Sequence, residues 1–257
     1  MKLIDTHAHL DFPKLSDDLD ATLEAAREAG VERIVTIGAS RELDSNYRAL
    51  SIAEQYDWIR CTTGIHPHDA DIANDETFGV IRDEFSENEQ VVGIGETGLD
   101  YYYEKATVEN QKWSFRKHLE LADELGKPVV IHSRDADEDC IAMLEETGVT
   151  HGILHCFTGG RWMAEQLWDM GFYLSFSGIV TFNSATELLE IAAETPEDRI
   201  LFETDSPFLA PVPNRGKTNQ PAYVRHTAAK IAEARGVELE AFAEQVWENA
   251  SRVFGWE

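Results

Sequence analysis

Eight short apolar segments alternate along this chain with longer, mostly acidic segments of helical periodicity, and this alternation restricts the possible folds most strongly. The short segments are rich in Val, Ile and Phe, and most are continuously apolar, which is typical of strands buried on both faces of a parallel sheet. They are Lys2–Thr6, Arg33–Ile37, Ile59–Ile65, Val91–Gly95, Pro128–Ile131, Gly152–Cys156, Phe172–Ser177 and Ile200–Thr204.

Eight successive strand-then-helix units without a break in composition predict an α/β protein with a (β/α)8 TIM-barrel fold. An open, doubly wound sheet is the alternative, but no GxGxxG or Walker loop follows any of the apolar segments. Because barrels of about 250 residues commonly form one unit, we expect a single domain over residues 1–257.

The segments between the predicted strands carry signals for the ends of helices. Ser16 is a candidate N-cap for a helix that contains Leu19 and Leu23. A last helix over about Leu239–Val253 is expected to close the bottom or the side of the barrel. Four helices, including the one that contains Leu19 and Leu23, are expected to end at glycines that precede a strand, namely Gly30, Gly126, Gly148 and Gly171.

The chain carries 48 acidic and 22 basic side chains, a formal net charge of −26. Such a surface repels itself unless salt screens it, so we expect a salt-adapted protein that does not bind nucleic acid along an extended face. The first residues show no basic segment followed by an apolar stretch, so we expect no signal peptide, and no run of about 18 apolar residues suggests a membrane helix. We therefore expect a cytoplasmic protein without a membrane partner or an obligatory protein partner.

Candidate metal ligands follow the predicted strands, where the βα loops of a barrel gather. A single histidine at the end of a strand is more often structural, but a whole set at one predicted face favours a metal site. His7 and His9 are two residues apart in an extended segment, so both side chains can face one ion. The candidate ligands are His7, His9, Glu96, His132, His155 and Asp205.

Four imidazoles and two carboxylates exceed what one four-coordinate ion needs while it keeps a position for water. They suit two or more divalent ions, with Glu96 as the bridging carboxylate. The mixed nitrogen and oxygen donors fit zinc or manganese and, less well, magnesium. We expect Asp205 to bind one ion and to accept the proton of the attacking water.

Other polar and aromatic residues near the strand ends are candidates for binding a substrate. His66 and His68 can orient a substrate or simply form part of the rim. Basic side chains that can hold phosphate oxygens, or remain solvated, are Arg134, Arg215 and Lys217. The Tyr101–Tyr103 run can stack a nucleobase or pack against the rim.

Together these segments resemble the signature blocks of the TatD family over the whole chain. The blocks are Asp5–Asp11, Gly64–His68, Gly95–Tyr102, His132–Ala136, His155–Phe157, Glu203–Pro207, Arg215–Lys217 with Asn219 and Pro221, and Asn249–Ala250. The resemblance implies a metal-dependent deoxyribonuclease, often a 3′–5′ exonuclease that uses magnesium or manganese.

The resemblance also implies roles for individual residues. His7, His9, Glu96 and Asp205 would hold one metal, while Glu96, His132 and His155 would hold the other. Glu203 would contact a further ion or the substrate. The family often has another base near Thr218 and an acid near Gln220, and this chain departs from it there.

Three classes of function remain open at this point. The first is a phosphodiesterase that acts on DNA ends or on another phosphate-bearing substrate. The second is hydrolysis of another ester or amide bond, such as the ester of aminoacyl-tRNA. The amide option is weakened because binuclear amidohydrolases commonly place a modified lysine where this chain has Glu96. The third is a non-catalytic protein that binds metal.

Overall fold

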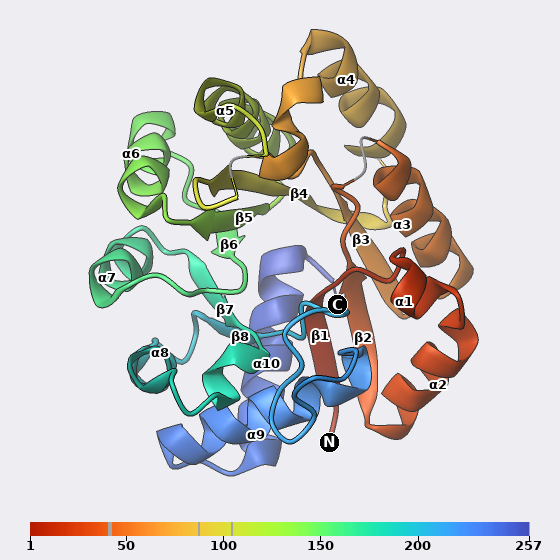
Figure 1. Cartoon of the computed structure of the whole chain (residues 1–257), viewed down its shortest axis with the longest axis vertical. Helices are drawn as coiled ribbons and strands as arrows, with labels where there is room; N and C mark the ends of the chain where they lie inside the picture. The colour runs from red at the N-terminus through yellow and green to blue at the C-terminus, as the bar shows by residue number, and fades with distance from the viewer. Residues whose placement is uncertain (41–42, 87, 104, 257) are drawn as a thin grey trace.

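A computed structural model describes residues 1–40, 43–86, 88–103 and 105–256 of the chain. All eight strands run parallel in one sheet and follow the chain in order from β1 to β8, as the alternation predicted (Figure 1). The strands are β1 (Leu3–Ala8), β2 (Val31–Thr36), β3 (Ile59–Thr63), β4 (Val91–Asp100), β5 (Val129–Arg134), β6 (Gly152–Leu154), β7 (Tyr173–Phe176) and β8 (Ile200–Phe202).

Helices surround the strands on the outside, and α10 lies behind them in the view of Figure 1. The α-helices are α1 (Pro13–Ser16), α2 (Leu19–Glu28), α3 (Asp44–Gln55), α4 (Asp75–Val80), α5 (Val108–Leu125), α6 (Asp137–Thr147), α7 (Arg161–Asp169), α8 (Thr186–Glu194), α9 (Val224–Arg235) and α10 (Leu239–Phe254). Shorter helical segments are η1 (Pro67–Ile72), η2 (Ile81–Ser86), η3 (Gly178–Thr181) and η4 (Pro221–Tyr223). None of the helices in the described part of the chain has the length and apolar character needed to span a bilayer.

The barrel is closed between β1 and β8 by a parallel bridge that joins Ala8 to Ser206 just beyond β8. Side chains reinforce this junction. The buried carboxylate of Asp5 accepts hydrogen bonds from the backbone amide of Thr204 at 2.9 Å and from its hydroxyl at 2.5 Å. The predicted TIM-barrel architecture is thereby confirmed, and the first and last strands meet where His7 and Asp205 emerge.

The predicted helix ends are confirmed at the glycines but not at Ser16. All four glycines have the positive φ of a left-handed cap: 89° at Gly30, 62° at Gly126, 70° at Gly148 and 85° at Gly171. Ser16 does not cap α2, because it is the last residue of α1, and Asp18 precedes α2. The last helix, α10, packs against β1 and β8, close to the predicted position.

Strand β4 is longer than the sequence predicted, since it continues past Gly95 to Asp100. Gly95 and Gly98 have φ values of 136° and 132°, which other residues rarely adopt. A Cβ atom on Gly98 would lie 2.1 Å from the carbonyl oxygen of His132 on β5, so only glycine permits this close approach. The extension places Glu96 and Asp100 inside the mouth of the barrel.

Candidate metal centre

Glu96 lies at the centre of the cluster, on β4, with only 2% of its surface exposed. Its Oε2 atom is 3.4 Å from Nε2 of His7 and 3.8 Å from Nε2 of His9. Its Oε1 atom is 2.8 Å from Nε2 of His155 and 3.1 Å from Nδ1 of His132. The two oxygens of one carboxylate therefore face two different pairs of histidines.

The first group of donor atoms forms where β1 meets the end of β8. The Nε2 atoms of His7 and His9 are 3.4 Å apart, so the two side chains converge as their spacing predicted. Oδ1 of Asp205 lies 3.3 Å from Nε2 of His9 and 3.8 Å from Nε2 of His7. These three donor atoms all lie within 4.8 Å of one another, an arrangement that can hold one ion together with Oε2 of Glu96.

The second group contains one residue more than the sequence suggested. His132 on β5 and His155 after β6 are joined at Oε1 of Glu96 by His66, whose Nε2 atom is 3.2 Å from that oxygen. We expected His66 and His68 to orient a substrate or to form part of the rim. Their rings remain in contact, with centroids 4.4 Å apart, but Nε2 of His66 faces Glu96 whereas Nε2 of His68 faces Asp100.

Two buried carboxylates lie behind the histidines. Oδ2 of Asp100 is 3.0 Å from Nε2 of His132 and 2.9 Å from Nε2 of His68. Oε1 of Glu203 is 3.2 Å from Nδ1 of His155. Metal-binding histidines commonly donate their second ring N–H to such a carboxylate, which fixes the tautomer and the ring orientation. Asp100 was not among the predicted site residues, although its even spacing from Glu96 along a strand places both on one face.

The electrostatics of the cluster favour positive charge at its centre. Burial by itself would raise the pKa of Glu96, but the charge on His155 and the hydrogen bonds from His132 and His155 outweigh it and hold that pKa well below its usual range. Burial also opposes the charge on His155, yet Glu96 and Glu203 raise its pKa well above the ordinary value. Burial lowers the pKa of His66 to about 4, which leaves its imidazole in the neutral form that binds metals.

The donor set fits divalent metal ions. Among the described residues, Oε2 of Glu96 is a buried oxygen that accepts no hydrogen bond, although it faces His7 and His9. A buried carboxylate oxygen without a donor is unfavourable unless it is paired or coordinates a metal. Imidazole nitrogens mixed with carboxylate oxygens suit zinc and manganese. The residues present thus satisfy the chemical requirements of the predicted metal site.

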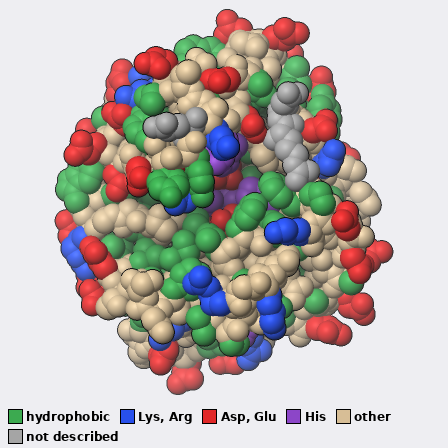
Figure 2. Space-filling model, viewed as in Figure 1, with side chains coloured by type: hydrophobic (Ala, Val, Ile, Leu, Met, Phe, Trp, Pro, Cys, Tyr) green, Lys and Arg blue, Asp and Glu red, His purple; other side chains and the backbone are tan. Residues whose placement is uncertain are grey.

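A cavity of about 570 Å³ opens above these ligands. Figure 2 shows histidines at the floor of a hollow near the centre of the face, with hydrophobic side chains around it. The lining includes Glu96, His132 and Asp205, and Arg134 is the one arginine or lysine among the described residues of the lining. The cavity is therefore an apolar-walled space with the ligand cluster beneath it.

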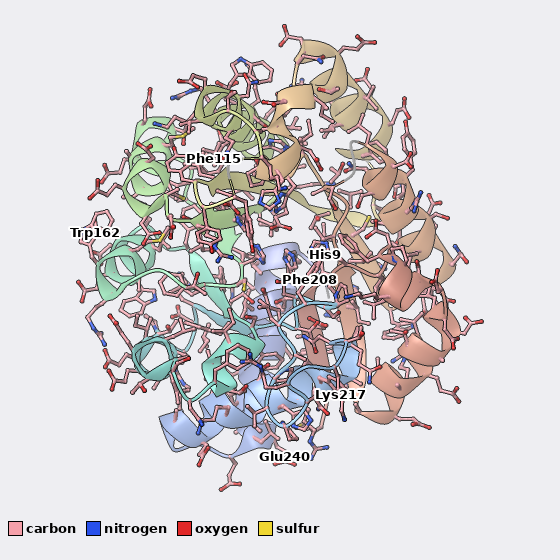
Figure 3. All side chains as sticks on the ribbon, in the orientation of Figure 1. His9, Phe115, Trp162, Phe208, Lys217 and Glu240 are labelled. Atoms are coloured by element: carbon pink, nitrogen blue, oxygen red, sulfur yellow. The ribbon has the colours of Figure 1, made fainter. Side chains whose placement is uncertain are left out.

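Three residues expected to bind substrate do not line this cavity in the described structure. Glu203 is fully buried behind His155. The guanidinium of Arg215 lies over the ring of Phe182, 3.5 Å from its centroid. Lys217 is on the exposed loop between β8 and α9, apart from His9 in Figure 3. By contrast, His66, His68 and Arg134 are all part of the cavity wall.

Comparisons with known proteins agree with this architecture. Residues 4–255 match the family described as TatD related DNase. The uncharacterized metal-dependent hydrolase YabD of Bacillus subtilis is 44% identical over 254 residues, which are 98% of either chain. The 3′-5′ ssDNA/RNA exonuclease TatD of Erwinia tasmaniensis is 35% identical over 98% of this chain and 99% of its own.

A solved structure has the same fold over nearly the whole chain. The crystal structure of YJJV, a TatD homologue from Escherichia coli K12, superposes with a TM-score of 0.93 at 28% identity and covers 99% of this chain and 98% of its own. The resemblance seen in the sequence motifs is thus confirmed by sequence and by structure. This chain belongs to the TatD family of metal-dependent hydrolases.

Proposed function

We propose that this protein is a two-metal phosphodiesterase that removes nucleotides from the ends of DNA, in the manner of a 3′–5′ exonuclease. The observation that carries the proposal is that the two carboxylate oxygens of Glu96 face different groups of histidines. Oε2 faces His7 and His9, while Oε1 faces the second group. A bridging carboxylate between two ions is the arrangement that clamps the attacking and leaving oxygens of a phosphoryl group. The relationship to the 3′-5′ ssDNA/RNA exonuclease TatD of Erwinia tasmaniensis supports the same activity.

The two groups of donor atoms define which residues would hold each ion. The first ion would be held by His7, His9, Glu96 and Asp205, and the second by Glu96, His132 and His155. His66 is placed to complete the second set. Divalent ions bound there would neutralise phosphate charge and make a water molecule more acidic.

Asp205 has the position and the charge state required of a proton acceptor. It lines the cavity, and its side chain is 13% exposed, whereas that of Glu96 is only 2% exposed. Burial alone would raise its pKa, but the interaction with His9 prevails, so the pKa is lowered and the carboxylate is ionised at neutral pH. Asp205 would therefore take the proton from the water that attacks phosphorus.

Arg134 would hold the non-bridging oxygens of the scissile phosphate. Its guanidinium lies 4.1 Å from the ring centroid of Tyr102 and 4.9 Å from that of Tyr103, so aromatic faces fix its position at the cavity wall. An arginine can donate two parallel hydrogen bonds to a phosphate. One such contact beside the ligand cluster provides a local attraction that the net charge of −26 does not.

The surroundings of the cavity favour cleavage at the end of a DNA strand. A second cavity of about 770 Å³ continues past Arg134, and its wall carries the carboxylates of Asp135, Asp137, Glu138 and Asp139. Acidic walls repel the phosphate backbone of DNA, so a DNA strand is not expected to run through both cavities. A single terminal nucleotide that enters the first cavity avoids this repulsion.

The test is a side-by-side assay of the manganese-reconstituted protein on single-stranded DNA, duplex DNA, RNA and aminoacyl-tRNA. With DNA labelled at its 5′ end, we expect a ladder of products that shortens from the 3′ end and disappears when EDTA is added. Release of amino acid from aminoacyl-tRNA without any shortening of DNA or RNA would overturn the proposal in favour of ester hydrolysis.

A further inference from the structure

The cavity has an aromatic wall that the metal chemistry does not use. Phe12 follows β1 and Phe208 follows β8, and their ring centroids are 5.4 Å apart in an edge-to-face arrangement. Both rings also contact the imidazole of His9, at centroid distances of 5.2 and 5.9 Å. Phe208 is nevertheless 42% exposed, and Figure 3 shows it beside His9 near the centre of the face.

Phe208 is exposed but firmly held. Its backbone amide donates to the carbonyl of Asp205 at 2.9 Å, and its own carbonyl accepts from the side-chain amide of Asn219 at 2.6 Å. Asn219 is fully buried and also donates to the carbonyl of Thr204 at 2.8 Å. The backbone that carries this ring is thus held in place, which favours binding because less conformational entropy remains to be lost.

The opposite wall of the cavity has complementary chemistry. Tyr103 follows β4, and Arg134 ends β5, which lie four places away from β8 and β1 around the closed barrel. The backbone amide of Tyr103 donates to Oδ1 of Asp100 at 2.9 Å, which fixes this wall as well. An occupant therefore meets aromatic rings on one side and a tyrosine with a guanidinium on the other.

We propose that Phe208, supported by Phe12, stacks the base of the terminal nucleotide and makes cleavage depend on that base. This inference rests on the proposed phosphodiesterase function. A nucleotide is the occupant that fits, because it offers a flat ring for Phe208, a phosphate for Arg134 and a hydrolysable bond above Asp205. The cavity volume of about 570 Å³ is that of a pocket for one small ligand, not of a protein interface.

The first experiment compares two single-stranded oligonucleotides of equal length, one with a natural 3′-terminal thymidine and one with an abasic tetrahydrofuran residue there. Stacking on an aromatic ring contributes about 1–3 kcal/mol per base, so the intact end should be cleaved with a kcat/KM about 5- to 100-fold higher. In Phe208→Ala and Phe208→Leu this ratio should fall towards one, while Phe208→Trp should retain it. The matched control is Trp162→Ala, since Trp162 is 49% exposed on α7 and lines neither cavity.

The second experiment reads base stacking without catalysis. An oligonucleotide with 2-aminopurine at its 3′ end, attached through a non-hydrolysable phosphate analogue, is bound to the metal-loaded protein, and the quenching of its fluorescence is measured. Quenching is expected for the unaltered protein, Trp162→Ala and Phe208→Trp, but not for Phe208→Ala or Phe208→Leu. Equal cleavage of both ends by the unaltered protein, without quenching, would overturn the base-stacking role and leave the phosphodiesterase intact. Quenching without cleavage of either oligonucleotide would support the stacking role and overturn the proposed exonuclease.

Discussion

Oε1 of Glu203 lies 3.2 Å from Nδ1 of His155, and this contact turns the other nitrogen of the imidazole towards Glu96. The same oxygen accepts a hydrogen bond from the backbone amide of Cys156 at 2.8 Å. The carboxylate therefore fixes both the imidazole ring and the backbone next to it. Glu203 is fully buried and contributes no surface to the cavity. Its position is that of a residue that orients a ligand, not of one that touches substrate.

Glu203→Gln should weaken metal binding through His155. The amide still accepts the bond from Cys156, but the negative charge that supports the imidazole is lost. Losing such an outer carboxylate typically lowers metal affinity or activity about 10- to 100-fold. Competition with a fluorescent chelator measures the affinity. An unchanged affinity with an altered KM would instead assign Glu203 to the substrate.

The sequence predicted the barrel and the convergence of the six candidate ligands because both depend on alternation of strands and helices. It did not predict the outer half of β4, because Glu96–Asp100 is mostly polar and interrupted by a glycine, and the burial of this segment depends on neighbouring strands. The positions of Arg215 and Lys217 depend on the path of a long loop after β8, which no periodic pattern records.

The position of Arg134 gives a prediction with a matched control. Arg134 lines the cavity, whereas Arg215 stacks on Phe182 outside it. A charge-assisted hydrogen bond contributes about 1.5–3 kcal/mol, so Arg134→Ala should lower kcat/KM on single-stranded DNA about 10- to 100-fold. Arg215→Ala should change it less than about threefold. Comparable losses in both variants would mean that the loop after β8 also contacts the scissile phosphate.

His118, which is not among the candidate metal ligands, should make folding stability depend on pH. Its Nε2 accepts the backbone amide of Ile65 at 2.9 Å, and Nδ1 lies 2.8 Å from the carbonyl of Ser114. Burial lowers its pKa from 6.5 to about 4, so the folded protein binds the proton less readily than the unfolded chain. This contribution to stability is complete above pH 6.5 and is lost as the pH falls towards 4.

The contribution of His118 to the free energy of unfolding should fall by about 3 kcal/mol over that pH range. Between pH 7 and pH 4, the free energy of unfolding measured in urea should decline less for His118→Gln than for the unaltered protein. The side-chain carbonyl of this glutamine can still accept a hydrogen bond from the backbone amide of Ile65. The exposed His151 offers a control, because His151→Gln should leave the decline unchanged. Identical pH profiles for His118→Gln and the unaltered protein would contradict the assignment.

The net charge of −26 should make stability depend on salt. Repulsion among surface carboxylates destabilises the compact state, and added ions screen it. The melting temperature should therefore rise as potassium chloride is increased from low to molar concentration. A flat or falling melting temperature would contradict salt adaptation but would not affect the metal site.

The central claim, that Glu96 serves both ions whereas Asp205 serves one and accepts a proton, is tested by paired measurements on two variants. Metal content and exonuclease rate are determined on the same preparations of Glu96→Ala and Asp205→Asn. The first change removes an oxygen from each group, so metal content and activity should both be lost. The second keeps an oxygen for the metal but removes the base, so most metal should remain while the rate falls about 10²- to 10⁴-fold. Full activity in Asp205→Asn, or two ions retained by Glu96→Ala, would contradict this account.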